Sequence, residues 1–164
     1  MMNELRRLEE QLRAAVEGSA WHGPAVLELL SDVTPEQAAA RPIAGAHSIW
    51  ELVLHLAGTY RLVLRRVRGD GRQLSLEEDW PAVGAVSAID WRESVAALRE
   101  LNAEVRRVLS TFPADRLDEQ LVSESPYTAY TQFIGLTQHD LYHAGQIALL
   151  KRAVTGRSPT SPTA

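Results

Sequence analysis

The sequence contains no cysteine, so the fold can hold no disulfide, and a metal site would have to use histidine, aspartate or glutamate side chains. A reaction that needs a thiol would require a small molecule to supply it. The chain also lacks a run of about 20 apolar residues, the length that a membrane-spanning helix requires. Residues 1–7 include no apolar segment of the signal-peptide kind. We therefore expect a cytoplasmic protein with no membrane partner.

Strong charge is also missing, because the net charge of the 164-residue chain is only −4. This charge gives no general attraction to nucleic acid, and we expect no nucleic-acid partner. A nucleic-acid surface remains the alternative for one helix, which has a stripe of arginines at Arg61, Arg65 and Arg68, with Arg66 and Arg72 nearby. A solvated helix face explains this stripe better, since no nucleic-acid recognition motif accompanies it.

Long runs of alternating β-branched residues are absent as well, which indicates an all-α chain. Apolar residues instead recur at helical spacing between glycine and proline breaks. The predicted helices cover residues 3–16, 26–30, about 49–68, 91–111 and 128–154.

These segments predict a four-helix bundle, with residues 3–16 as a short extra N-terminal helix. The connection after residue 68 has about 20 residues, which favours a long crossover over simple up-down-up-down topology. We expect residues 1–155 to form a single domain and residues 156–164 to form a flexible C-terminal tail.

Two histidines stand four residues apart on the last predicted helix, at His139 and His143. Positions i and i+4 lie on one helix face about 6 Å apart, so both imidazoles can bind one metal ion. An isolated pair of this kind is equally compatible with two ordinary core histidines. His55, among apolar residues of another predicted helix, favours the metal site, because facing helices of a bundle often build such sites.

Other residues around these histidines have two open interpretations each. His139-Asp140-x-x-His143 resembles the zinc-protease pattern His-Glu-x-x-His, but Asp140 is too short and no later histidine or glutamate follows. Asp140 itself is expected at the surface or behind a metal ligand. We expect Glu51, one turn before His55, to orient that imidazole. Four further residues could line the site or serve only structural roles, namely His22, His47, Tyr142 and Gln146. Trp50 and Trp80 could likewise wall a pocket or belong to the core.

The segment His139 to Ile147, together with His55 in a leucine-rich helix opened by Ser48-x-x-Glu51, resembles the DinB-like superfamily of metal-binding four-helix bundles. This is the DNA-damage-inducible family, not the DNA polymerase of the same name. The resemblance spans about residues 20–155. Two further segments, residues 20–24 and 45–50, are similar to one bacterial branch of the family.

The resemblance implies three metal ligands, which fall on His55, His139 and His143 in this sequence. It also implies a left-handed crossover bundle that is often dimeric, and relatives that include thiol-dependent S-transferases, a maleylpyruvate isomerase and metal-dependent hydrolases. We therefore expect a divalent metal ion, Zn²⁺ or Ni²⁺ by ligand type, with a low-molecular-weight thiol as a candidate co-substrate.

The expected activity is transfer or hydrolysis on a small-molecule substrate. Such an ion lowers the pKa of a coordinated water to about 7, or removes the proton of a thiol. The alternative is a non-catalytic metal or small-molecule binder of the stress-response type. We also expect a homodimer, because the apolar positions of residues 3–16 would otherwise need a partner.

Overall fold

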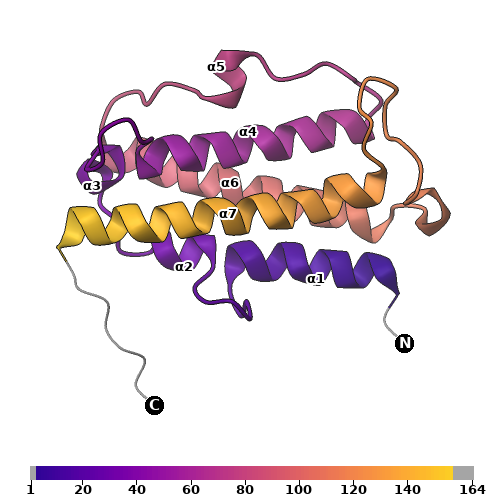
Figure 1. Ribbon diagram of the computed structural model, residues 1–164, viewed down its shortest axis with the longest axis horizontal. Helices are drawn as coiled ribbons and strands as arrows, with labels where there is room; N and C mark the ends of the chain where they lie inside the picture. The colour runs from indigo at the N-terminus through magenta and orange to yellow at the C-terminus, as the bar shows by residue number, and fades with distance from the viewer. Residues whose placement is uncertain (1–2, 157–164) are drawn as a thin grey trace.

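The chain folds into an all-α bundle built on four long helices (Figure 1). The computed structural model describes residues 3–156, and within this range the only β-type pairing is an isolated bridge between Gln120 and Thr128. The long helices are α1 (Glu4–Glu17), α4 (Ile49–Val67), α6 (Ala88–Ser110) and α7 (Ala129–Thr155). Short helical turns occupy the connections, namely α2 (Val26–Leu30), α3 (Pro35–Ala39), α5 (Leu76–Asp79) and the 3₁₀ turn Ala114–Arg116.

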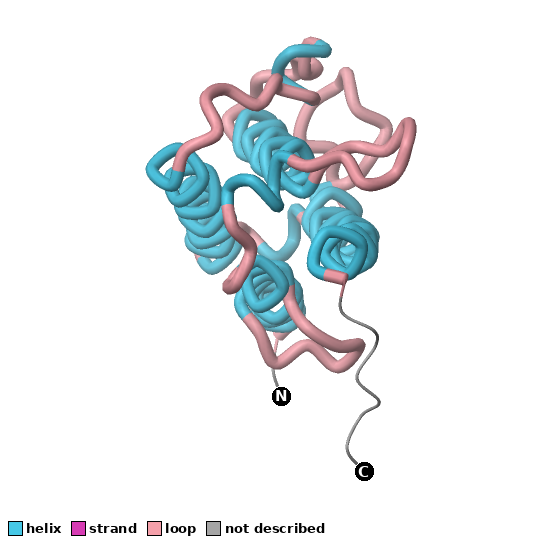
Figure 2. Tube along the Cα trace, turned by 90° about the vertical axis from the view of Figure 1, so that its left-hand side faces the viewer, coloured by secondary structure: helices cyan, strands magenta, loops and turns pink. Residues whose placement is uncertain are grey.

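The four long helices stand at the corners of a square when the bundle is seen from its end (Figure 2). Helices α1 and α4 each pack against both α6 and α7. Helices α4 and α6 run in the same direction. Residues 68–87 connect them and return along the bundle over α4 (Figure 1). The predicted bundle with a long crossover is therefore confirmed. One detail differs, because α1 is itself one of the four bundle helices, whereas α2 is only a short turn.

Side-chain caps explain where the long helices begin. Ser48 Oγ accepts a hydrogen bond from the Glu51 N–H at 3.2 Å, and the Glu51 carboxylate accepts one from the Ser48 N–H at 2.7 Å. This reciprocal cap satisfies backbone donors that a helix start leaves free. The start predicted for α6, residue 91, was wrong. Ser87 caps this helix by accepting the Asp90 N–H at 3.1 Å, so α6 begins one turn earlier.

The apolar stripe of α1 is buried inside the chain. Leu8, Leu12 and Val16 are at most 2% exposed in the core shared with the other long helices. The argument that this helix needs a partner chain was therefore wrong, although the homodimer itself stays a prediction.

Two further expectations concern the membrane and the limits of the domain. No helix in the described part of the chain is both long and apolar enough to cross a membrane. The single domain over residues 1–155 remains a prediction. Of the predicted tail, residues 157–164 lie outside the described residues.

Candidate metal centre

Three imidazoles from two helices meet between α4 and α7. His55 comes from α4, and its Nε2 lies 3.1 Å from Nε2 of His139 on α7. Nε2 of His143, one turn further along α7, lies 3.1 Å from the same His139 atom. Each residue offers a ring nitrogen, and all three nitrogens lie within 4.8 Å of one another. Zinc–nitrogen bonds near 2.1 Å in a tetrahedral site would place such nitrogens about 3.4 Å apart.

The outer nitrogens of two of these rings are held by acceptors. His55 Nδ1 lies 2.9 Å from the backbone carbonyl of Asp79 and 3.0 Å from its carboxylate. His143 Nδ1 lies 2.9 Å from the side-chain oxygen of Gln146. An acceptor at Nδ1 favours the tautomer with its proton on that atom, which leaves a lone pair on Nε2. The lone pairs of both rings therefore face the shared centre.

The third ring, His139, is kept neutral by its surroundings. Burial lowers the pKa of His139 to about 4, and repulsion from the neighbouring His143 and His55 acts in the same direction. Burial also lowers the pKa of His143. Unprotonated imidazole is the form that binds metal, so His139 and His143 are ready to bind a cation at neutral pH. His139 Nδ1 is buried and has no hydrogen-bond partner.

Glu51 does not orient His55, so that expectation was wrong. Its carboxylate caps the start of α4 at Ser48 and also pairs with Arg41. A capping carboxylate is turned back towards the helix start and away from the following turn. Asp79 takes the role instead, from the crossover segment. The sequence gives no register between that segment and α4, and only the unusual length of the connection pointed to it.

Trp80 follows Asp79 and lies flat between two histidines. Its ring stacks on His55, with centroids 3.9 Å apart and planes 1° apart, and on His47, with centroids 3.7 Å apart and planes 9° apart. His47 therefore reaches the rim of the site without joining the ligand cluster. Trp50, the other candidate pocket wall, is a core residue that is 2% exposed and donates to Ser94 at 2.9 Å.

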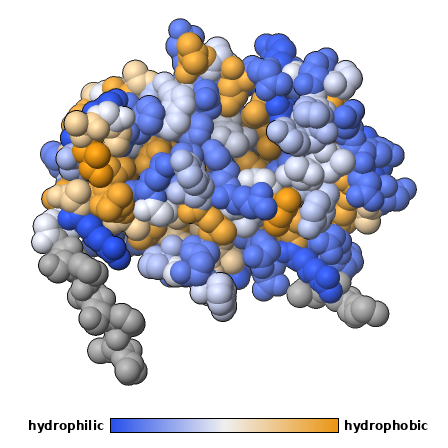
Figure 3. Space-filling view, in the orientation of Figure 1, coloured by the Kyte–Doolittle hydropathy of each residue, from blue (hydrophilic) through white to orange (hydrophobic). Residues whose placement is uncertain are grey.

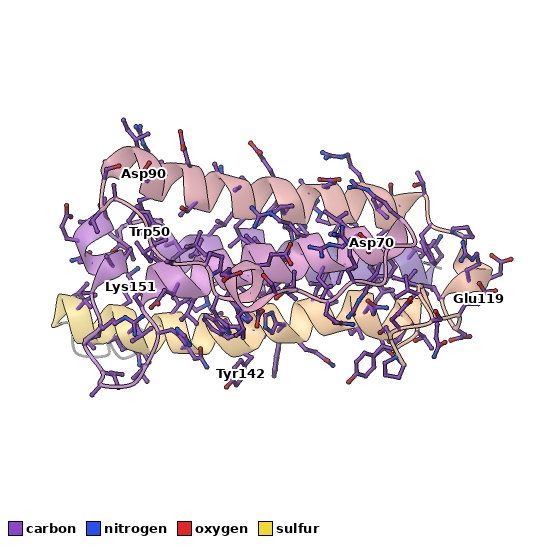
Figure 4. All side chains as sticks on the ribbon, turned by 90° about the horizontal axis from the view of Figure 1, so that it is seen from above. Trp50, Asp70, Asp90, Glu119, Tyr142 and Lys151 are labelled. Atoms are coloured by element: carbon purple, nitrogen blue, oxygen red, sulfur yellow. The ribbon has the colours of Figure 1, made fainter. Side chains whose placement is uncertain are left out.

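Of the other candidate residues, Gln146 and Tyr142 lie beside a clustered histidine and His22 does not. Gln146 contacts His143 directly, so it supports a ligand. Tyr142 is 66% exposed and projects from α7 away from the bundle (Figure 4). Its ring lies edge-on to His143, with centroids 5.0 Å apart. His22 is exposed and lines a separate cavity of about 420 Å³ beside α1 and α7, with Thr137.

Asp140 is fully buried, which excludes the surface, one of the two positions expected for it. Because α7 packs against both α1 and α4, the side chain next to His139 also faces the core. Tyr60 donates to its carboxylate at 2.6 Å, and Asn102 donates to the Tyr60 oxygen at 2.8 Å. Burial raises the pKa of Asp140 to about 8. A buried polar network therefore joins α4, α6 and α7 through the residue that follows His139.

This raised pKa predicts how stability depends on pH in the metal-free protein. Between about pH 4 and pH 8 the folded state holds a proton on Asp140 that the unfolded chain releases, so rising pH reduces stability. Asparagine does not titrate, so Asp140→Asn should gain stability relative to wild type from pH 5 to pH 8 and level off above. Urea unfolding in the presence of a chelator measures this difference.

Asp70→Asn is the matched control for this measurement. Hydrogen bonds from Arg72 lower the pKa of the half-buried Asp70 to about 2, below the whole pH range of the experiment. Its stability difference from wild type should therefore be flat from pH 5 to pH 9. A flat profile for Asp140→Asn as well would contradict the assignment of a raised pKa to Asp140.

Comparison with known proteins agrees with this architecture. The sequence profile described as the DinB superfamily matches residues 20–147, a range that includes all three clustered histidines. Neither the comparison with curated proteins nor the comparison with solved structures finds a match. Because the profile covers most of the chain, the resemblance stated from the sequence is confirmed, and this protein belongs to the DinB superfamily.

Proposed function

We propose that this protein binds one divalent metal ion through His55, His139 and His143 and uses it for transfer or hydrolysis on a small molecule. The supporting observation is the convergence of three imidazole nitrogens, two of whose rings are held in the ligating tautomer by Asp79 and Gln146. Ordinary core histidines need no such shared centre. Zn²⁺ or Ni²⁺ suits an all-imidazole site best.

Three protein ligands are fewer than these ions accept, so the site leaves positions open for an external group. When bound, the cation would act as a Lewis acid and lower the pKa of a water or thiol placed beside it. The protein's own residues hold and orient the metal-binding imidazoles. Asp79 and Gln146 fix two rings, while Trp80 covers one face of His55 and keeps that side dry.

The chain supplies no cysteine, so a thiol-transfer reaction would draw on a low-molecular-weight thiol as co-substrate. A transferase of this kind should consume an electrophile only when thiol and metal are both present. A hydrolase should instead cleave activated esters or amides without thiol. Either reaction fits a cytoplasmic protein, which remains our proposal for its location.

The alternative function is a non-catalytic metal or small-molecule binder of the stress-response type. The observation that favours it is the engagement of Glu51, the nearest glutamate on α4, in a helix cap and an ion pair. A Glu51 substitution would therefore report on the helix start and would not separate enzyme from binder. Activity itself has to be measured.

The test measures turnover with zinc or nickel restored to chelator-treated protein. A panel of cysteine, glutathione and cysteamine is combined with 1-chloro-2,4-dinitrobenzene, and p-nitrophenyl acetate tests hydrolysis. An enzyme should show turnover that requires the added metal and disappears in His139→Ala. Metal binding without turnover in any assay would favour the binder.

Two partner hypotheses remain. We propose a homodimer, for which the outer face of α7 is the candidate surface. Leu149, in the C-terminal part of α7, is 57% exposed, and apolar side chains gather around that end of the helix (Figure 3). Light scattering at several protein concentrations would test it. Four of the five arginines invoked for nucleic acid are engaged within the chain. Ion pairs join Arg65 to Glu78, Arg68 to Glu104 and Arg72 to Asp70, and Arg66 is buried against Gln132.

A further inference from the structure

The crossover between α4 and α6 passes along α4 (Figure 1). It contacts the histidine cluster through Asp79 and Trp80, which both lie against His55. Residues 75–80, here called the strap, comprise α5 and its two flanking residues. The strap supplies both acceptors for His55 Nδ1, through the Asp79 carbonyl and carboxylate, and the Trp80 ring that stacks on His55. The orientation of this imidazole therefore depends on where the strap lies.

The strap approaches α4 at Gly58, which is buried and lies one turn after His55 on the same helix face. A Cβ atom at position 58 would lie 2.7 Å from the backbone carbonyl oxygen of Glu78, closer than real Cβ contacts allow. The obstacle is backbone, so no side-chain rotation can relieve it. Glycine at this position lets the strap reach α4 at its present distance.

Glu78 precedes Asp79 directly, so a shift of the Glu78 carbonyl moves the Asp79 carbonyl that accepts from His55 at 2.9 Å. We infer that Gly58 is a positioning residue for the metal centre. It permits the close approach of the strap that fixes His55, although it touches no ligand itself. This inference rests on the proposed metal-binding function.

Other contacts make the strap move as a unit. Ser75 and Glu78 cap α5 reciprocally, at 2.9 Å and 3.2 Å. Glu78 also pairs with Arg65 on α4 at 3.0 Å. A displacement at Glu78 is therefore passed along α5 to its neighbours and is not absorbed by a loose loop. Glycine within a helix is less favourable than alanine, so helix propensity alone would favour alanine at position 58.

The test compares zinc affinity of Gly58→Ala with that of Gly135→Ala, measured by competition with a chromophoric chelator. Gly135 is also a helical glycine, but a Cβ there would meet nothing within 4 Å. Both variants gain the same helix propensity, and only Gly58→Ala disturbs the strap. We expect Gly58→Ala to bind zinc about 10- to 100-fold more weakly with unchanged stoichiometry, the usual cost of losing a ligand's supporting partner. Gly135→Ala should bind as wild type.

A second measurement separates positioning from general loss of structure. Nitrogen-15 spectra should lose the protected Nδ1–H signal of His55 in Gly58→Ala and keep that of His143, whose partner Gln146 lies on α7. If Gly58→Ala does not fold, Trp80→Leu tests the strap by removing the stack on His55, and it should also weaken zinc binding about tenfold.

The outcomes are distinct. Wild-type affinity in a folded Gly58→Ala, or in Trp80→Leu where Gly58→Ala does not fold, would overturn the role of the strap and leave the proposed function standing. An intact Nδ1–H signal of His55 in a folded Gly58→Ala would also overturn it. Wild-type protein that binds neither zinc nor nickel would overturn the proposed function as well.

Discussion

His143→Ala should abolish stoichiometric binding of a divalent ion. His143 contributes one of three nitrogens that lie within 4.8 Å of one another, and the structure offers no other group of three such ligands among the described residues. Losing a supporting partner costs about 10- to 100-fold in metal affinity, so losing a ligand should cost more than 100-fold. Isothermal titration with zinc, on protein purified without an affinity tag, measures the change.

His22→Ala is the matched control, because His22 is exposed and lies outside the cluster. It removes one imidazole from the protein and should leave zinc affinity and stoichiometry unchanged. Equal loss of binding in both variants, or equal retention, would show that zinc binds somewhere other than the cluster. Thermal unfolding of the metal-free proteins checks that neither change disturbs the bundle.

Tyr60→Phe should destabilise the protein by at least about 2 kcal/mol, because one hydroxyl serves two buried groups. Tyr60 is fully buried, donates to Asp140 at 2.6 Å and accepts from Asn102 at 2.8 Å. Phenylalanine keeps the ring and its packing but withdraws both hydrogen bonds. Each buried partner left unsatisfied costs about 1 to 3 kcal/mol. Urea unfolding of the metal-free variant measures the free-energy change.

Tyr130→Phe provides the comparison, since Tyr130 also lies on a long helix but is 37% exposed. Water can replace whatever its hydroxyl contacts, so a change within about 0.5 kcal/mol is expected. If Tyr60→Phe were as stable as Tyr130→Phe, the hydrogen bonds of Tyr60 to Asp140 and Asn102 would not contribute to the stability of the fold.

The fold could be predicted from local signals. Helical spacing of apolar residues and the cap at Ser48 placed the long helices, and the length of the connection after residue 68 indicated the crossover. The role of α1 was predicted wrongly. The sequence shows several helical segments, but it does not show which of them packs as the fourth helix of the bundle. The start of α6 was predicted one turn too late, since both Ser87 and Asp90 are good capping residues.

The three clustered histidines could be identified because two share a helix face and the third lies in an apolar helix. Their supporting residues were harder to predict. Asp79 and Trp80 come from a connection whose position against α4 depends on tertiary packing at Gly58. Glu51 lies one turn before His55, which is a suitable spacing for orienting it. Its carboxylate instead accepts a hydrogen bond from the Ser48 N–H at the helix start. The burial of Asp140 could not be predicted without knowing which helices flank α7.

The most direct test is anomalous diffraction at the zinc edge from crystals grown with one equivalent of zinc. We expect a single strong peak about 2.1 Å from Nε2 of each of His55, His139 and His143. A zinc peak elsewhere, with these three imidazoles still bonded only to one another, would contradict it.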